Sequence, residues 1–261
     1  MQELTLYQID AFTDRRFGGN PAGVCPLKSW LPDSTLQAIA AENNVAETAF
    51  FVPEGDGYKL RWFTPTVEVE LCGHATLATG FVISNFLEPG RDAMRFSTRS
   101  GTLGLTREGK GFVLDFPARE PKRVDPAPDF RKALGRQPKE VLATQQWLAV
   151  FENEADVREL RPDNAEIVAL GRQGIIATAP GNDRDYVCRF FVPQAGIPED
   201  PATGMAQCTL TPYWAKQLGK TELTGRQISR RVGEFRLELK GDRVRIAGEA
   251  VCYLKGSIFV D

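Results

Sequence analysis

One stretch of the chain places a thiol, a glycine and the only histidine next to each other. It reads LCGHATLATGFVISNF, from residue 71 to 86, with Cys72, Gly73 and His74 at its start. Thiols and imidazoles transfer protons or attack electrophilic carbon. The uncharged run from Ala75 predicts a helix that is buried on nearly every face. Because the first N–H groups of a helix have no partner inside it, we expect an anion to bind at its start.

This stretch belongs to an internal repeat. RWFTP, from Arg61, matches RFFVP, from Arg189. Seven residues beyond the proline of each motif stand Cys72 and Asp200, and each is followed by a turn, an Ala-Thr pair and a predicted helix. The halves therefore look like copies, each with a reactive residue where a strand passes into a helix. Two copies that face each other would bring Cys72 and His74 opposite Asp200 across a cleft.

Two further polar residues lie beside predicted strands. Asn20 belongs to a glycine-rich segment, FGGNPAGV, where loop chemistry is expected and asparagine either forms a turn or binds a ligand. Glu47 precedes the apolar part of a strand predicted over residues 45–52. It is either a solvated residue at the edge of a sheet or a catalytic group.

The remaining elements follow from periodicity and from turn residues. Helices are predicted over residues 32–44, 75–86, 130–134, 155–160, 164–169 and 207–218. Strands are predicted over 5–12, 58–63, 95–106, 111–116, 141–143, 147–151, 174–179, 186–192, 230–240 and 243–254. The segment 117–128 is rich in proline and charge and is interpreted as the linker between the halves.

Composition narrows the class of protein. The 261 residues are 42% hydrophobic and 25% charged with a formal net charge of −2, so no excess charge attracts nucleic acid or an anionic membrane. The N-terminal segment lacks the basic and apolar regions of a signal peptide, which predicts a cytoplasmic protein. The helix over 75–86 is shorter than the roughly 20 residues of a membrane span. Five cysteines without a CxxC pair predict neither a disulfide framework nor a structural zinc site, and a single histidine excludes a multi-histidine metal site.

A site of this kind suits proton transfer at a carbon atom next to a carboxylate. Glu47, His74 and Asp200 are the candidate acids and bases, since burial moves the pKa of a carboxyl group towards neutrality. Each candidate also has a structural interpretation. Asp200 fits a helix N-cap, His74 fits a packed and hydrogen-bonded side chain, and Cys72 fits a small buried apolar residue.

Five motifs in this order, FGGNPAGV, ETAF, RWFTP, LCGHATLA and EDPATG, resemble the phenazine-biosynthesis PhzF-like family. That family has the fold of diaminopimelate epimerase and proline racemase. The resemblance implies an α+β fold of two similar domains related by a pseudo-twofold axis, each a rolled, mostly antiparallel sheet around a central helix. With the linker, it gives domains over residues 1–116 and 117–261, with the last strands able to cross back to the first. It also implies a homodimer and no metal or organic cofactor.

The same resemblance assigns roles. In the family's characterised isomerase a glutamate moves a proton on a carboxylated cyclohexadiene, and by motif this glutamate matches Glu47. His74 and Asp200 match residues that line the substrate and help to position it or its proton. The residues expected to surround the ligand are Asn20, Cys72, Gly73, Thr203, Gly204 and Met205. The resemblance thus predicts an isomerase that transfers a proton within a small carboxylated metabolite.

The sequence departs from the family at Met205 and Gln207, where serine is usual and histidine is frequent. Replacing a hydroxyl by a thioether removes a hydrogen bond worth roughly 1–3 kcal/mol. This departure keeps open a binding protein of the same fold with weak or no catalysis. A third interpretation is an epimerase that uses Cys72 with Asp200 or Glu47. Asp200 stands where the related racemases have a second cysteine, which disfavours a two-thiol mechanism.

Overall fold

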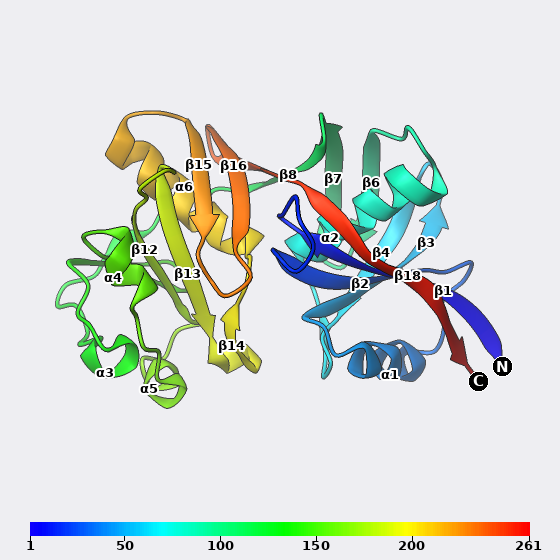
Figure 1. Ribbon diagram of the computed structural model, residues 1–261, viewed down its shortest axis with the longest axis horizontal. Helices are drawn as coiled ribbons and strands as arrows, with labels where there is room; N and C mark the ends of the chain where they lie inside the picture. Colours follow the sequence, from blue (N-terminus) through cyan, green and yellow to red (C-terminus); the bar gives the residue numbers. More distant parts are fainter. The chain divides into compact units, whose positions relative to one another are not determined.

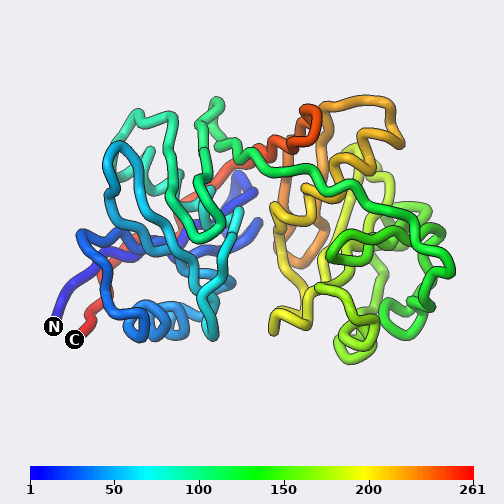
Figure 2. The backbone as a smooth tube through the Cα atoms, turned by 180° about the vertical axis from the view of Figure 1, so that it is seen from behind, coloured from blue at the N-terminus to red at the C-terminus, as the bar shows by residue number.

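The two long strands nearest the ends of the chain pair with each other. β1 (Gln2–Ala11) runs antiparallel to β18 (Ala250–Val260) along the whole of its length. Figures 1 and 2 show the two termini side by side as a result. The computed structural model describes all 261 residues, which divide into two units, Met1–Asp115 with Ala247–Asp261, and Phe116–Ile246. The final strand therefore belongs to the first unit.

The first unit is a mostly antiparallel sheet that surrounds one apolar helix, α2 (Gly73–Val82). Its other strands are β2 (Asn20–Pro26), β3 (Glu47–Glu54), β4 (Gly57–Phe63), β5 (Glu68–Val69), β6 (Ala93–Thr98), β7 (Gly101–Glu108) and β8 (Gly111–Pro117). Helix α2 contacts β1, β2, β3, β7 and β18, and eight of its ten residues are buried. The hydroxyl groups of Thr76 and Thr79 donate to the carbonyls four residues earlier, at 2.6 and 2.7 Å. These hydrogen bonds give both buried hydroxyl groups a partner within the apolar core.

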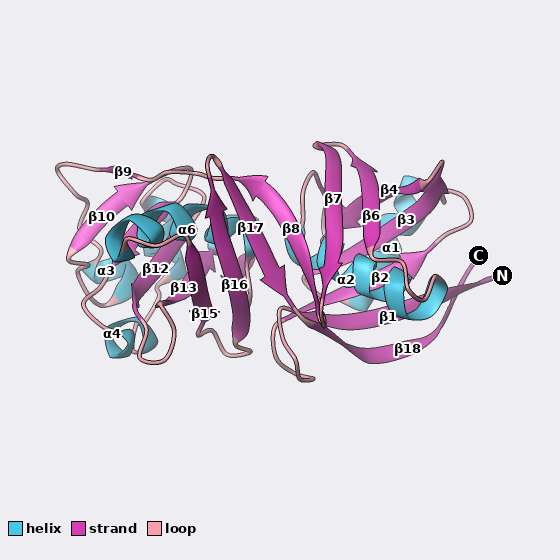
Figure 3. Cartoon of the chain, turned by 90° about the horizontal axis from the view of Figure 1, so that it is seen from above, coloured by secondary structure: helices cyan, strands magenta, loops and turns pink.

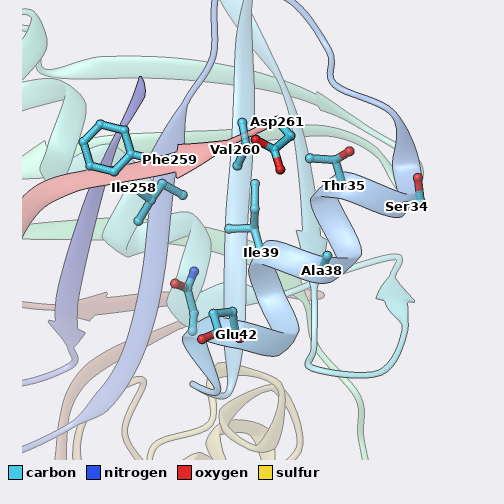
Figure 4. A pocket seen from close by; sticks show the side chains of 10 residues that line it. Ser34, Thr35, Ala38, Ile39, Glu42, Ile258, Phe259, Val260 and Asp261 are labelled. Carbon is cyan, nitrogen blue, oxygen red and sulfur yellow. The ribbon is translucent and has the colours of Figure 1, made fainter. Parts of the chain in front are cut away.

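A second helix, α1 (Asp33–Asn43), packs on the same unit. Its apolar face buries Leu36, Ile39 and Ala40 in a cluster with residues of β2, β3 and β4. A pocket of about 460 Å³ lies where α1 meets the end of β18. Its lining side chains, shown in Figure 4, are those of Ser34, Thr35, Ala38, Ile39, Glu42, Asn43, Ile258, Phe259, Val260 and Asp261. No histidine or cysteine lines this pocket, so it does not contain the thiol and the imidazole predicted to be reactive.

The second unit is also built mainly from strands, as Figure 3 shows for the chain as a whole. Its strands are β9 (Lys122–Arg123), β10 (Glu140–Ala143), β11 (Trp147–Val150), β12 (Ile175–Pro180), β13 (Tyr186–Val192), β14 (Ile197–Asp200), β15 (Glu222–Gln227), β16 (Gly233–Lys240) and β17 (Arg243–Gly248). Its helices are α3 (Arg131–Leu134), α4 (Glu154–Arg158), α5 (Asn164–Ala169), α6 (Gly204–Leu218) and the short 3₁₀ helix η2 (Pro193–Ala195). No helix of the structure is both long and apolar enough to cross a membrane.

The two units repeat the same order and sense of strand pairing. In the first, β2 and β3 are parallel, β3 and β4 antiparallel, β4 and β5 antiparallel, β4 and β6 parallel, and β6 and β7 antiparallel. In the second, the same sequence of pairings joins β11, β12, β13, β14, β15 and β16. The short strand β5 precedes α2, and the short strand β14 precedes α6. The internal repeat inferred from RWFTP and RFFVP is therefore present in the backbone.

Several predicted boundaries are wrong. Residues 95–106 form parts of two strands, because Arg99 and Ser100 make a turn between β6 and β7, and β7 begins at Gly101 with φ 100°. Residues 243–254 are likewise divided between β17 and β18 by Glu249. Asn20 begins β2 and does not lie in a loop. The helix predicted over 75–86 begins two residues earlier, and after Val82 it widens into a π-helix, η1 (Ile83–Leu87).

Helix α6 begins three residues before its predicted start, which places Pro212 in its middle and not in its first turns. A proline has no N–H, so the carbonyl four residues earlier, that of Cys208, loses its partner within the helix. The backbone N–H of Arg119 donates to this carbonyl at 2.9 Å. The segment that follows β8 thus supplies the missing hydrogen bond and lets the helix continue through the proline.

An arginine fork fixes the segment before each central helix. Arg61 in β4 donates through Nε and Nη2 to both oxygens of Glu68 at 2.7 and 2.8 Å, and its guanidinium lies over the Phe63 ring. Arg189 in β13 donates in the same way to both oxygens of Glu199 at 2.9 and 2.8 Å and lies over the Phe191 ring. Bidentate pairs of this kind fix orientation as well as distance. They fix β5 and β14, the short strands that lead to the starts of α2 and α6.

We expect Arg189→Lys to lower the free energy of unfolding by about 1–3 kcal/mol, because lysine cannot form the fork and leaves a partly buried carboxylate poorly paired. Urea unfolding followed by circular dichroism measures the change. Arg131→Lys is the matched control, since Arg131 and its partner Asp129 are both exposed and separated by 3.4 Å. Its effect should stay within about 0.5 kcal/mol. Equal effects of the two substitutions would contradict a structural role for the fork.

Candidate active site

Four polar side chains of the first unit converge at the start of α2. Asn20 is the first residue of β2 and Glu47 is the first residue of β3. These strands run parallel, with Ala22 opposite Glu47, so they begin at the same edge of the sheet. Cys72 is the N-cap of α2 and His74 is its second residue. The strand register and the start of the helix therefore place all four at one edge.

His74 lies at the centre of this group, with a different partner on each ring nitrogen. Its Nε2 lies 3.2 Å from Oε2 of Glu47. Its Nδ1 lies 3.2 Å from Nδ2 of Asn20 and 3.5 Å from Sγ of Cys72. An amide nitrogen only donates, so Nδ1 accepts and the hydrogen of a neutral ring resides on Nε2, the nitrogen that lies 3.2 Å from the carboxyl group. The contact with Asn20 thus selects one tautomer of the imidazole.

The burial of His74 keeps the imidazole uncharged. The residue is 6% exposed, and burial lowers its pKa to about 3. At neutral pH the ring is therefore uncharged, so its 3.2 Å contact with Glu47 is not an ion pair. The carboxyl side chain of Glu47 is 15% exposed, so it is partly open to the surroundings while one oxygen contacts the histidine. The interpretation of Glu47 as a solvated edge residue is wrong.

The N-terminus of α2 contributes a partial positive charge to the site. Cys72 is extended, at φ −144° and ψ 109°, and its side chain makes no capping hydrogen bond to the helix. Gly73 is the first helical residue. The partial positive charge of the helix N-terminus therefore lies next to the pair of Glu47 and His74, where it favours a negatively charged group.

The second unit carries the other predicted residues at the start of α6. Asp200 ends β14, Thr203 is the N-cap of α6 and Gly204 is its first residue. The hydroxyl of Thr203 donates to Oδ2 of Asp200 at 2.5 Å. The interpretation of Asp200 as the N-cap is wrong, because Thr203 occupies that position. The structure brings Asn20, Glu47, Cys72, Gly73 and His74 together in one unit and Asp200, Thr203, Gly204 and Met205 in the other. The cleft between them stays a prediction.

Gln227, which the sequence did not single out, organises this second group. It is fully buried at the end of β15, its Oε1 accepts from the Thr203 N–H at 2.9 Å, and its Nε2 donates to the Asp200 carbonyl. Gln207 is also fully buried. It accepts from the Tyr186 hydroxyl at 2.5 Å and donates to the Thr203 carbonyl at 3.2 Å, so it belongs to the packing of α6. Met205, by contrast, is 38% exposed at the first turn.

One group of side chains is suited to holding a metal ion. Donor atoms of Glu47, Cys72 and His74 all lie within 4.8 Å of one another. The remaining cysteines are free thiols, of which Cys25, Cys188 and Cys208 are buried. Burial raises the pKa of Cys25 and of Cys188 to about 12, so these two stay protonated and unreactive.

The fold is that of the amino-acid epimerases and racemases. The structure matches that of a hydroxyproline epimerase from Agrobacterium vitis with a TM-score of 0.60, covering 98% of this chain and 92% of that one. The two sequences are only 10% identical, so this likeness shows the fold alone. Fold and site therefore define a protein of epimerase-like fold that holds a carboxyl group beside a buried imidazole.

Within this class, the chain belongs to the PhzC-PhzF family of phenazine biosynthesis-like proteins, which it matches over residues 9–256. It is 47% identical over 256 residues to a Pseudomonas aeruginosa protein named as an uncharacterized isomerase, covering 98% of this chain and 99% of that protein. A crystal structure of a PhzF-family phenazine biosynthesis protein from Enterococcus faecalis matches with a TM-score of 0.97 at 41% identity. It covers 99% of this chain and 100% of that one.

The burial of His74 predicts a stability that falls with acidification. The pKa of His74 is about 3 in the folded state and about 6.5 when the chain is unfolded, so only the unfolded state gains a proton between these values. Stability is therefore retained above pH 6.5 and is lost as the pH falls towards 3. Between pH 7 and pH 5 we expect a loss of about 2 kcal/mol in the free energy of unfolding.

Urea unfolding at a series of pH values, in the presence of a chelator, measures this loss. The chain has no other histidine, so His74→Gln should remove most of the slope between pH 7 and pH 5. An unchanged slope in that variant would show that the imidazole is not held neutral.

Proposed function

We propose that the protein is an isomerase that moves a proton between two carbon atoms of a small carboxylated metabolite. Glu47 is the acid and base of this reaction. The observation that carries the proposal is the contact of 3.2 Å between Glu47 and a neutral His74 next to the start of α2. The epimerase-like fold and the relatives named isomerases support the same class of reaction.

In this proposal each residue has one task. Because His74 contacts Oε2 of Glu47, Oε1 is the oxygen that accepts and releases the proton. Glu47 removes it from a carbon atom next to the substrate carboxylate, or from a carbon conjugated with it, and returns it to a second carbon. The negative charge that develops on the substrate spreads into its carboxylate, which the N–H groups at the start of α2 stabilise. With its low pKa, His74 does not compete with Glu47 for the proton.

The partners and the location of the protein belong to the same proposal. We expect a small carboxylic acid as the substrate and a homodimer as the working form. Exposed apolar side chains of β18, among them Tyr253, Leu254 and Phe259, support a surface for a second copy. Five free thiols support a reducing compartment, which agrees with the expected cytoplasmic location. Light scattering at several protein concentrations tests the dimer.

Isotope exchange tests the proton transfer. We expect deuterium to enter at least one compound of a panel of cyclic and amino carboxylic acids incubated with the protein in deuterated water. Mass spectrometry and proton NMR identify the compound and the labelled carbon. Glu47→Gln should lower the exchange rate by about 10²–10⁴-fold, because the amide cannot accept the proton.

Glu54→Gln is the matched control, since Glu54 lies on the same strand and is exposed. Its exchange rate should equal that of the unaltered protein. If Glu47→Gln keeps its rate, Glu47 is not the base. If the rate instead disappears on alkylation of Cys72, the thiol epimerase is favoured. Thermal stabilisation by one compound without exchange would favour a binding protein, for which the exposed Met205 is the motivating feature.

A further inference from the structure

We propose that Cys72 and His74 bind a thiophilic divalent cation such as Zn²⁺, and that the bound cation stops the proton transfer by Glu47. The effect on the reaction rests on the proposed function, whereas binding of the cation does not. The donor set consists of one thiolate, one imidazole nitrogen and the amide side chain that faces them.

The spacing of the donors fits tetrahedral coordination. Sγ of Cys72 lies 3.5 Å from Nδ1 of His74. In a tetrahedral zinc site, with bonds of about 2.3 Å to sulfur and about 2.0–2.1 Å to nitrogen, these two atoms lie about 3.6 Å apart. A cation can therefore bind both atoms with little movement of either side chain.

The other side of the ring is arranged as it is in many metal sites. A histidine that binds a metal through one nitrogen usually donates its other N–H to a carboxylate, which fixes the tautomer and the ring orientation. In this protein too a carboxylate lies beside the other ring nitrogen, since Oε2 of Glu47 is 3.2 Å from Nε2 of His74. The carboxyl group that serves as base in the proposed reaction is then the group that orients the metal-binding imidazole.

Asn20 is placed to complete the coordination. Its side-chain amide lies 3.2 Å from Nδ1 of His74 and is fully buried. A half-turn of this amide brings its oxygen to the same position, where it meets the cation on the side of Nδ1. Two strong protein donors and one amide oxygen leave a coordination position for water or for a substrate carboxylate. We therefore expect an exchangeable cation and not a permanent structural one.

The chemistry of the donors sets the choice of cation. Thiolate and imidazole favour Zn²⁺ and Cd²⁺ over Mg²⁺ and Ca²⁺, which prefer oxygen. On binding, the Cys72 thiol loses its proton to solvent and a bond from Sγ to the cation forms in its place. The positive charge of the bound cation then lies next to the Glu47 carboxylate, and this charge opposes the arrival of a proton there.

Titration of the chelator-treated protein with Cd²⁺ tests the site. Near-ultraviolet absorbance from charge transfer between thiolate and metal should rise and saturate at one Cd²⁺ per chain. Cys72→Ser should abolish it, and Cys72→Ala, with its fold checked by circular dichroism, should do the same. Cys252→Ser is the matched control, because Cys252 is the most exposed thiol and should leave the signal unchanged. A signal that survives in Cys72→Ser would overturn the proposal.

Two further variants separate binding from function. His74→Gln should weaken Cd²⁺ binding by more than 10-fold, and unchanged affinity would remove the imidazole from the site. Glu47→Gln should still bind Cd²⁺, with an affinity lower by about 10–100-fold, although it no longer exchanges deuterium. In the unaltered protein, Zn²⁺ should stop deuterium exchange and a chelator should restore it. Full exchange at saturating Zn²⁺ would overturn the regulatory part alone, and absence of exchange under all conditions would count against the proposed function and not against the metal site.

Discussion

In the first unit each ring nitrogen of one buried histidine has its own polar neighbour. Nδ1 of His74 accepts from Asn20 and lies near the Cys72 thiol, while Nε2 lies 3.2 Å from Oε2 of Glu47. This arrangement requires β2 and β3 to begin at the same edge of the sheet and α2 to begin there as well. The parallel register of the two strands and the extended N-cap at Cys72 meet that requirement. The sheet, the helix and the proposed chemistry all depend on the same contacts.

The two units share their pairing order but differ at the junction. In both, an arginine fork holds a short strand that leads to a central helix. In the first unit the junction holds a thiol and an imidazole, which exchange protons or bind cations. In the second, Gln227 and the Thr203 hydroxyl organise Asp200, and neither titrates near neutral pH. The two units therefore share the same backbone framework, whereas the side chains at their two helix starts differ in chemistry.

Local patterns and motif spacing in the sequence predicted the main elements and the residues at the start of α2. Alternation located most of the strands, and the apolar run after His74 located α2. The short strands β5 and β14 and the strand β15 escaped prediction because pairing with β4 or β13 creates them, and such pairing leaves no local signal. Asn20 was expected to face a ligand, but its contact with His74 depends on strands and a helix that are far apart in the chain. Gln227 was missed for the same reason, since its role arises from contacts with Asp200 and Thr203.

The departures at Met205 and Gln207 both lie in α6 of the second unit, whereas Glu47 and His74 belong to the first. Gln207 is fully buried, and its amide is occupied by Tyr186 and by the Thr203 carbonyl, so it contributes to the packing of α6. Of these two residues only Met205 is exposed, and its thioether lies in the first turn of α6. Neither residue takes part in the contacts among Glu47, His74 and Asn20. These two residues therefore give no physical reason why the contacts of Glu47 and His74 should be lost.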